Sequence, residues 1–409
     1  MIFALILIGL ILEGWLILGL IGLSKGWLRF TLALPISALT CTLIIFILTI
    51  FKISLTPISI LGLNLILIIV LLLIRKRINE LTNKRTNQLT NKPINFLYLL
   101  LIPTLIYAFA HSVVLPTFHY DSATNWNQRS QISFYEKQIV FETHNDLIKK
   151  PHYPFLYHSL QITTHQLQPE WNDHFANTIH FLFNISALIA LLLMTKSLLA
   201  LVLIVTTPLF AMHLGGGYAD VTLTLFALLS FASYLEFKKS DERLWLILSA
   251  IFISACVWAK SEGLLLCLLP WLLMVGIKKP ALIAIGLSLL WPIFAVLKGI
   301  PLSPHGTSDL SIGLQTGAIT EVLKVIFISG SIGPVLPVTL AIALFRIRNP
   351  KSEIRNLIFP LTSLILILCI YTLTPNAEYL INGQSFDRQL LLPTALFVLN
   401  FLDLLKPSK

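Results

Sequence analysis

The sequence predicts an all-α polytopic membrane protein with about 13 transmembrane helices and one large outer loop that carries interfacial helices. Hydrophobic residues make up 56% of the 409-residue chain and charged residues only 12%, whereas soluble domains contain about 25% charged residues. Apolar runs of roughly 17 to 25 residues, the length of a membrane-spanning helix, recur along the chain. They lie at residues 1–23, 28–50, 57–74, 96–116, 176–195, 197–213, 218–237, 243–259, 261–277, 281–299, 321–345, 356–373 and 389–404.

The basic residues indicate how these spans are oriented. When the connecting segments are assigned alternately to two sides, one side receives 20 of the 29 lysines and arginines. By the positive-inside rule this side is cytoplasmic, which puts the N-terminus outside and the C-terminus inside. The net charge of +10 therefore reflects orientation, and no nucleic-acid partner is expected. The first run lacks a basic segment before it and a small-residue cleavage site, so we expect a retained helix. The Ile/Leu/Asn-rich composition is typical of a multi-pass protein of a bacterial cytoplasmic membrane.

Two kinds of polar residue lie inside the apolar runs. The four cysteines have no C-x-x-C spacing, so they predict packing residues and support neither a disulfide framework nor a zinc site. Glu13 lies inside the first run, where a carboxyl group is costly and is often functional. A neutral carboxyl that faces the bundle is the structural alternative, and the sequence leaves both open.

The outer side carries the candidate chemistry, because it receives 12 of the 19 acidic residues and has all ten histidines in its loops or near the adjoining helix ends. Its only large loop is 117–175. We therefore predict an N-terminal three-helix membrane unit at 1–74, a cytoplasmic basic loop at 75–95, a membrane catalytic domain at 96–404 that includes this loop, and a cytoplasmic tail at 405–409.

The large loop begins with Tyr120 and Asp121, about one turn after an apolar helix ends. A carboxylate at this boundary can be ionised and still lie beside a lipid-borne substrate. Trp126 and the aromatic and aliphatic residues after it alternate with polar ones, which favours a helix along the interface. A second helix is predicted at 155–166, after a proline-flanked turn that contains Tyr153.

A triple glycine at 215–217 predicts a tight outer turn that places Tyr218 and Asp220 at the start of the next span. Asp220 can contribute chemistry, or it can serve only as a negative charge at a helix N-terminus. Both roles suit its position equally.

Lys260, Glu262 and Arg388 are polar residues at the outer ends of other spans. Lys260 has no positive-inside reason for its position, so we expect it either to pair with Glu262 or to project toward an anionic group. Arg388 offers a planar fork suited to phosphate, and snorkelling to the interface is the alternative. The convergence of these residues with the two aspartates on one side predicts a common site.

Five segments occur in a characteristic order and resemble the GT-C integral membrane glycosyltransferases, particularly bacterial relatives of protein O-mannosyltransferases and of aminoarabinose transferase. They are Tyr120-Asp121 followed by Trp126, then KKPHYPFLYHSLQ (149–161), GGGYADVTLTLF (215–226), AKSEGLLL (259–266) and SFDRQLLLP (385–393). The resemblance covers roughly residues 96–404. The family usually carries its acid after the first span, whereas here three further spans come before it, so residues 1–74 look like an added unit.

The resemblance implies a GT-C-like hexosyl- or pentosyltransferase that moves a sugar from a polyprenyl-phosphate donor to an extracytoplasmic acceptor, which can be a lipid, a glycan or a protein. By the same resemblance Asp121 would be the general base and Asp220 would help to organise the site. Lys260 and Arg388 would contact the donor phosphate. We also expect membrane lipids as partners, and substrate contacts from the residues around these positions: Tyr120, Trp126, Tyr153, Tyr218 and Glu262.

No cofactor is predicted, because the outer side has no D-x-D sequence, although His119 beside Asp121 leaves a partial divalent-metal site open. Three other functions remain: a transporter or lipid flippase, a surface-polysaccharide polymerase or ligase that uses a diphosphate-linked glycan, and a non-catalytic scaffold. The absence of an internal repeat counts against the transporter. The scarcity of paired acids counts weakly against the diphosphate-dependent enzyme.

Overall fold

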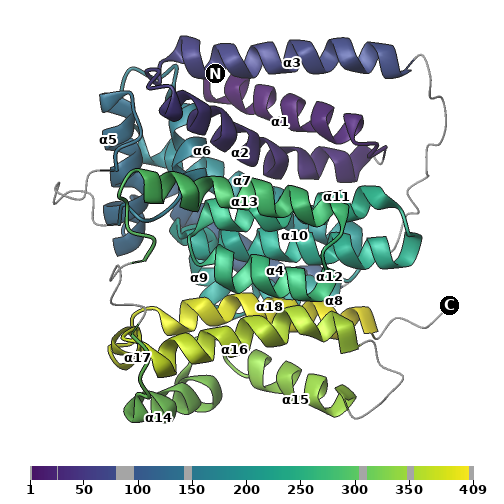
Figure 1. Cartoon of the computed structure of the whole chain (residues 1–409), viewed down its shortest axis with the longest axis vertical. Coiled ribbons are helices and arrows are strands. Elements are labelled where there is room, and N and C mark those ends of the chain that lie inside the picture. The colour runs from purple at the N-terminus through teal and green to yellow at the C-terminus, as the bar shows by residue number, and fades with distance from the viewer. Residues whose placement is uncertain are drawn as a thin grey trace.

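The computed structural model describes residues 2–24, 26–79, 96–141, 150–303, 311–347 and 354–404, and every regular element in these ranges is helical (Figure 1). The α-helices are α1 (Ile2–Leu20), α2 (Gly26–Ile50), α3 (Pro57–Asn79), α4 (Leu97–Phe109), α5 (Gln128–Glu136), α6 (Leu156–His165), α7 (Asp173–Thr195), α8 (Leu198–Val205), α9 (Pro208–Gly216), α10 (Ala219–Ser240), α11 (Arg243–Ala259), α12 (Leu269–Val275), α13 (Lys279–Leu297), α14 (Thr316–Lys324), α15 (Val335–Ile347), α16 (Ile358–Leu373), α17 (Ala377–Ile381) and α18 (Phe386–Leu404). Four π-helical turns, η1 (Ala110–Val114), η2 (Ser122–Asn127), η3 (Leu264–Leu268) and η5 (Val325–Ser329), and one 3-10 turn, η6 (Ile354–Leu357), complete the described elements.

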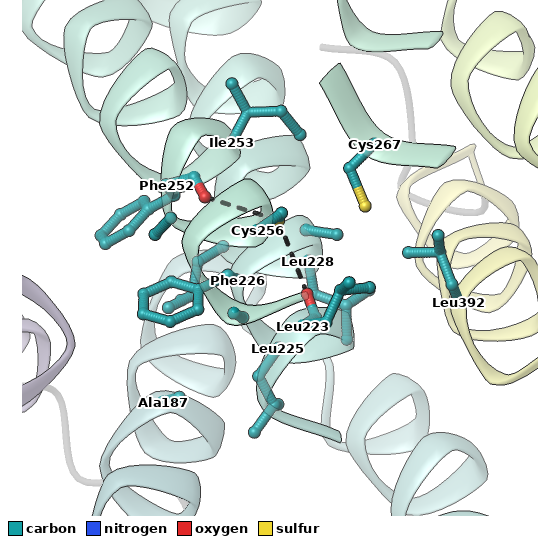
Figure 2. Close-up of a cluster of buried hydrophobic side chains, with 14 of the residues drawn as sticks. Ala187, Leu223, Leu225, Phe226, Leu228, Phe252, Ile253, Cys256, Cys267 and Leu392 are labelled. Carbon is teal, nitrogen blue, oxygen red and sulfur yellow. Dashed lines mark hydrogen bonds between the residues drawn. The ribbon is translucent and has the colours of Figure 1, made fainter. Parts of the chain in front are cut away.

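The centre of the bundle is α10, which packs against α7, α11 and α18 (Figure 1). Its apolar stretch is 89% buried, because α7, α11 and α18 pack around it. Figure 2 shows the core beside it, where side chains from α7, α10, α11, η3 and α18 meet around Cys256. The Cys256 Sγ lies 3.6 Å from the carbonyl oxygen of Leu223 and 3.5 Å from that of Phe252. All four cysteines are free thiols, and only Cys369 is exposed.

The predicted fold class, an all-α polytopic membrane protein, is confirmed. Eight of the described helices are long and apolar enough to cross a membrane, or nine if the bent pair α8–α9 forms one span, and three shorter apolar helices accompany them. The predicted run 197–213 is bent by 78°, because Pro208 follows two threonines that end α8. The predicted run 321–345 is interrupted at Gly330–Pro334, because a glycine and a proline again separate two helical segments.

The three N-terminal helices share the core of the remaining bundle. α2 packs against α6 and α7, and the Phe46 ring lies 6.0 Å from Phe155, 5.0 Å from Trp258 and 5.4 Å from Phe294. Glu13 is fully buried inside α1. The division at residue 74 stays a prediction, and most of the predicted loop 75–95 and the predicted tail 405–409 lie outside the described residues.

The large loop forms two helical segments at one end of the bundle, as the sequence predicts. η2 and α5 follow Asp121, and α6 follows the turn at Pro151 and Pro154. All ten residues of α6 are buried, because this helix packs against α2, α5 and α7 and is not laid on the surface. The loop is therefore a structural layer that closes this end of the bundle.

Candidate active site

Asp121 lies where the chain turns from the fourth membrane-spanning segment into the loop. α4 continues through η1, an extended segment follows, and Asp121 is the N-cap residue of η2. The amide of Asn125 donates a 3.0 Å hydrogen bond to Asp121 Oδ1. The guanidinium of Arg388 donates to Asp121 Oδ2. Both carboxylate oxygens of the predicted base are thus occupied by protein donors.

The triple glycine brings the second aspartate beside this segment. Gly217 ends α9 with a left-handed φ of 71°, and a Cβ there would lie 2.2 Å from Ser122 Oγ. A Cβ at Gly215 would lie 2.6 Å from the Cα of Ala108 in α4. Only glycine permits these approaches. The turn therefore places Asp220, in the first turn of α10, against the segment that carries Asp121.

Lys260 lies between α11 and η3 and is almost completely buried. Its Nζ is 3.0 Å from Asp220 Oδ1 and 3.4 Å from Glu262 Oε1, so it forms the expected pair with Glu262 and a second pair with Asp220, while contact with an anionic ligand stays a prediction. Burial alone would lower the pKa of Lys260, but the two carboxylates outweigh burial and raise the pKa well above its usual range. The ammonium group is therefore charged at any physiological pH.

Arg388, in the first turn of α18, joins the two aspartates. Its Nη1 donates to Asp121 and lies 4.0 Å from Asp220 Oδ2. The guanidinium carbon lies 5.3 Å from the centre of the Tyr218 ring, and its Nε is buried without a hydrogen-bond partner in the described structure. We call Asp121, Asp220, Lys260, Glu262 and Arg388 the ion-pair cluster; segments up to 267 residues apart contribute to it.

A cavity of about 280 Å³ opens beside the ion-pair cluster. Asp220, Lys260, Glu262 and Arg388 form its charged wall, and leucine and isoleucine side chains of η3, α16 and the segment after α13 form an apolar wall. The cavity thus offers charged groups and an apolar surface to one ligand. π-helical turns lie next to Asp121 and to Glu262, and such turns occur frequently at functional sites.

Aromatic side chains support the cavity from the loop side. Tyr153 lines the cavity and stacks on Trp126, with ring centroids 4.9 Å apart. Arg129 fixes this arrangement, because it donates to the carbonyl oxygens of Tyr153 at 2.8 Å and of Val140 at 3.1 Å. Ser261 adds a 2.6 Å hydrogen bond to the carbonyl oxygen of His152. The loop and the α11–η3 turn are therefore tied together around the cavity.

The structure brings most of the predicted site residues together, in three different settings. The cavity is lined by five of them, Tyr153, Asp220, Lys260, Glu262 and Arg388. Asp121 and Tyr218 contact this group through Arg388 and do not line the cavity. Trp126 lies behind Tyr153, and Tyr120 is 63% exposed and apart from the cavity. The roles of these residues stay predictions.

Sequence reasoning missed several residues around the cavity. Lys150 lines the cavity. Burial lowers the pKa of Lys150, and the positive charges of Lys260 and Arg388 lower it further, whereas the negative charges of Asp121 and Glu262 raise it. Like Lys260, Lys150 is a basic residue on the predicted outer side, which is poor in basic residues, and this signal could have identified it. Gln389 donates to Glu262 at 3.4 Å, and Arg129 binds backbone carbonyl oxygens. Nothing in the sequence marks either residue as part of the site.

The donor set does not favour a metal ion. Within the described ranges, no three histidine, cysteine, aspartate or glutamate side chains are grouped so that they could hold one. His119 lies against Tyr218, with ring centroids 5.4 Å apart. Metal independence stays a prediction that chelation of the working protein would test.

The fold and the cavity define a multi-pass helical membrane protein with a charged hollow at one end of its bundle. This architecture is similar to the crystal structure of ArnT from Cupriavidus metallidurans bound to undecaprenyl phosphate. The match has a TM-score of 0.53 at 13% sequence identity and covers 76% of this chain and 60% of ArnT. The predicted GT-C fold is confirmed by this match. No protein-family model and no curated protein matches the sequence.

Proposed function

We propose that this chain is a membrane glycosyltransferase that moves a sugar from a polyprenyl-phosphate donor to an acceptor outside the cytoplasm. The observation that carries the proposal is the ion-pair cluster beside a cavity with an apolar wall, in a fold shared with ArnT. A lipid-linked phosphate needs both a cationic group for its head and an apolar surface for its chain. A substrate without a lipid chain would need no apolar wall.

Lys260 and Arg388 are the candidates for contact with the donor phosphate. Lys260 is buried and charged at 3.0 Å from Asp220, and the partnerless Nε of Arg388 is a donor not used by the protein. A phosphate in the cavity would compete with Asp121 and Asp220 for Arg388, because each is an anion within reach of the same guanidinium. Charge-assisted bonds of this kind are about twice as strong as neutral ones.

Asp121 is the proposed general base. Donor binding that draws Arg388 toward the phosphate would release Asp121 Oδ2, so the base would become available only when the donor is in place. In the transfer step the acceptor hydroxyl loses its proton to Asp121 while its oxygen attacks the anomeric carbon of the sugar. The bond from that carbon to the phosphate oxygen breaks with inversion, and the departing polyprenyl phosphate takes the electron pair. Cations at the phosphate stabilise this developing charge.

The direct test is Asp121→Asn in the purified full-length protein, reconstituted in bilayers with a panel of polyprenyl-phosphate hexoses and pentoses and with membrane extract as the source of acceptor. We expect release of free polyprenyl phosphate to fall about 10² to 10⁴-fold, the usual contribution of a general base, while binding of undecaprenyl phosphate persists. Asp241→Asn is the matched control, because Asp241 is exposed at the opposite end of α10 in a left-handed conformation that asparagine tolerates.

Near-normal turnover of Asp121→Asn would refute its assignment as base. A wild-type protein that binds no polyprenyl phosphate and releases none would refute the transferase. Uptake of a solute or lipid by the same proteoliposomes would then favour the transporter, and turnover of a diphosphate-linked glycan would favour the polymerase or ligase.

A further inference from the structure

A second, larger hollow of about 650 Å³ lies at the same end of the bundle, outside the ion-pair cluster. Its walls come from the turn between α2 and α3, from the end of α5 with the segment after it, and from the end of α13. The backbone N–H of Leu55 donates a 2.6 Å hydrogen bond to the carbonyl oxygen of Lys137 and so joins the first two walls. We call this hollow the lysine groove.

Three lysines from these three separate segments line the groove: Lys52, Lys137 and Lys298. All three are exposed, and in the described ranges none of them forms an ion pair. Glu136 is the one acid among the residues that line the groove. Three cations around one hollow with one acid leave an excess of positive charge that an anionic ligand would neutralise.

The floor of the groove is apolar. Leu55, Ile139 and Phe294 line it and are buried, so the groove combines an apolar base with a basic rim. This combination suits the head and upper chain of an anionic lipid better than it suits a free anion, which would have no use for the apolar base.

Large apolar side chains next to two of the groove lysines are exposed, as expected for a surface that faces lipid. Phe51 is 70% exposed next to Lys52, and Leu297 is 80% exposed next to Lys298, and large exposed apolar side chains at the ends of spanning helices lie against the bilayer. Simple snorkelling explains one interfacial lysine. It does not explain why lysines from three distant segments line one hollow.

We propose that the lysine groove binds the phosphate headgroup of an anionic membrane phospholipid, with Lys52, Lys137 and Lys298 contacting the phosphate. This site is separate from the donor cavity and independent of the proposed transfer reaction. It gives the N-terminal helices a part in lipid binding, because Lys52 follows α2.

The test is native mass spectrometry of the full-length protein in detergent, titrated with dimyristoyl phosphatidylglycerol, dimyristoyl phosphatidylcholine and inorganic phosphate. Each basic group near an anionic lipid surface contributes about fivefold to binding. The variant Lys52→Gln/Lys137→Gln/Lys298→Gln should therefore bind phosphatidylglycerol about 100-fold more weakly, and the wild type should prefer phosphatidylglycerol to phosphatidylcholine.

The matched control is Lys196→Gln/Lys278→Gln/Lys279→Gln, which removes three exposed lysines elsewhere, including one with the left-handed conformation of Lys137. It should bind phosphatidylglycerol as the wild type does. Unchanged binding by the groove variant, or an equal loss in both variants, would overturn the proposal. Binding of inorganic phosphate as tight as that of phosphatidylglycerol would overturn the lipid as the ligand. Because the readout is lipid binding, it is independent of whether sugar transfer is found.

Discussion

The ion-pair cluster and the lysine groove are both rich in basic groups, but their charges are balanced differently. In the cluster, Lys260 and Arg388 each contact two carboxylates and are largely buried. In the groove, the lysines are exposed, and one acid lies among the residues around them. The cluster therefore has buried, paired side chains and a small net charge, whereas the groove has exposed side chains and an excess of positive charge.

This difference predicts two kinds of ligand recognition. A phosphate that enters the cavity must compete with carboxylates for fixed donors, so position and shape decide its binding. A lipid that approaches the groove meets exposed cations that form no ion pair within the described ranges, so net charge decides its binding, and that attraction weakens as salt rises. If both proposals hold, one end of the molecule combines a selective phosphate cavity with a site that binds anionic lipids by net charge.

The largest expected effect is on the free energy of unfolding, when one lysine is removed from the cluster and, for comparison, one from the groove. Lys260→Met would leave Asp220 buried beside an incomplete set of cations, and breaking a buried pair in this way costs about 3 to 5 kcal/mol. Lys298→Met removes an exposed lysine without an ion pair, so its expected cost is below about 0.5 kcal/mol. The free energy of unfolding in a mixed-micelle denaturant titration measures both.

A second change sharpens the result for the cluster. In Asp220→Asn/Lys260→Met the buried carboxylate is removed together with its partner, so most of the lost stability should return. Equal destabilisation by Lys260→Met and Lys298→Met would show that the cluster is as well solvated as the groove, contrary to the burial of Lys260.

Arg388→Lys should have the next largest effect, and on ligand binding more than on the fold. Lysine keeps the charge but lacks the planar guanidinium, whose Nη1 contacts Asp121 and lies 4.0 Å from Asp220 Oδ2 while its other nitrogens can face a phosphate. We expect undecaprenyl phosphate to bind about 10-fold more weakly, which corresponds to about 1.4 kcal/mol, while phosphatidylglycerol binding at the groove is unchanged. Arg243→Lys, at an exposed arginine in the first turn of α11, is the control. Unaltered undecaprenyl phosphate binding would remove Arg388 from the phosphate site.

The sequence was sufficient for the fold class and for most members of the cluster. Apolar runs of spanning length predict helices. On the predicted outer side few residues are basic, so a lysine or arginine at the end of a helix there indicates an anionic partner. Lys260 and Arg388 could be found in this way. The bend before Pro208 and the break at Gly330 could have been predicted from the same rules that placed the loop turn at Pro151.

Other features required the three-dimensional structure. The contact of Arg388 with Asp121 joins residues 267 positions apart, and no local pattern encodes it. The burial of α6 depends on its packing between other helices. The groove lysines, taken singly, resemble ordinary interfacial lysines, and only their shared hollow distinguishes them. Arg129 resembles any polar residue of an interfacial helix until its backbone acceptors are known.

Acid should affect the support of the cavity but not the groove. His158, in α6, is buried, and its Nδ1 lies 2.7 Å from Ser130 Oγ. Burial holds the pKa of His158 well below its usual 6.5, and the neighbouring Arg129 lowers it further. The unfolded chain therefore takes up a proton below about pH 6.5 that the folded chain does not. The free energy of unfolding should fall as pH drops through this range, by up to about 1.4 kcal/mol per pH unit for this one group.

His158→Gln should make this pH dependence shallower by one proton, because glutamine does not titrate. Burial also lowers the pKa of His165, so His165 should account for part of the pH dependence that remains in this variant. His174→Gln, which replaces an exposed histidine, is the control for the loss of a histidine as such. Unfolding titrations from pH 7 to 5 provide the measurement, with an identical slope in His158→Gln as the contrary result. No histidine is among the residues that line the groove, so phosphatidylglycerol binding per folded molecule should not change while the free energy of unfolding declines.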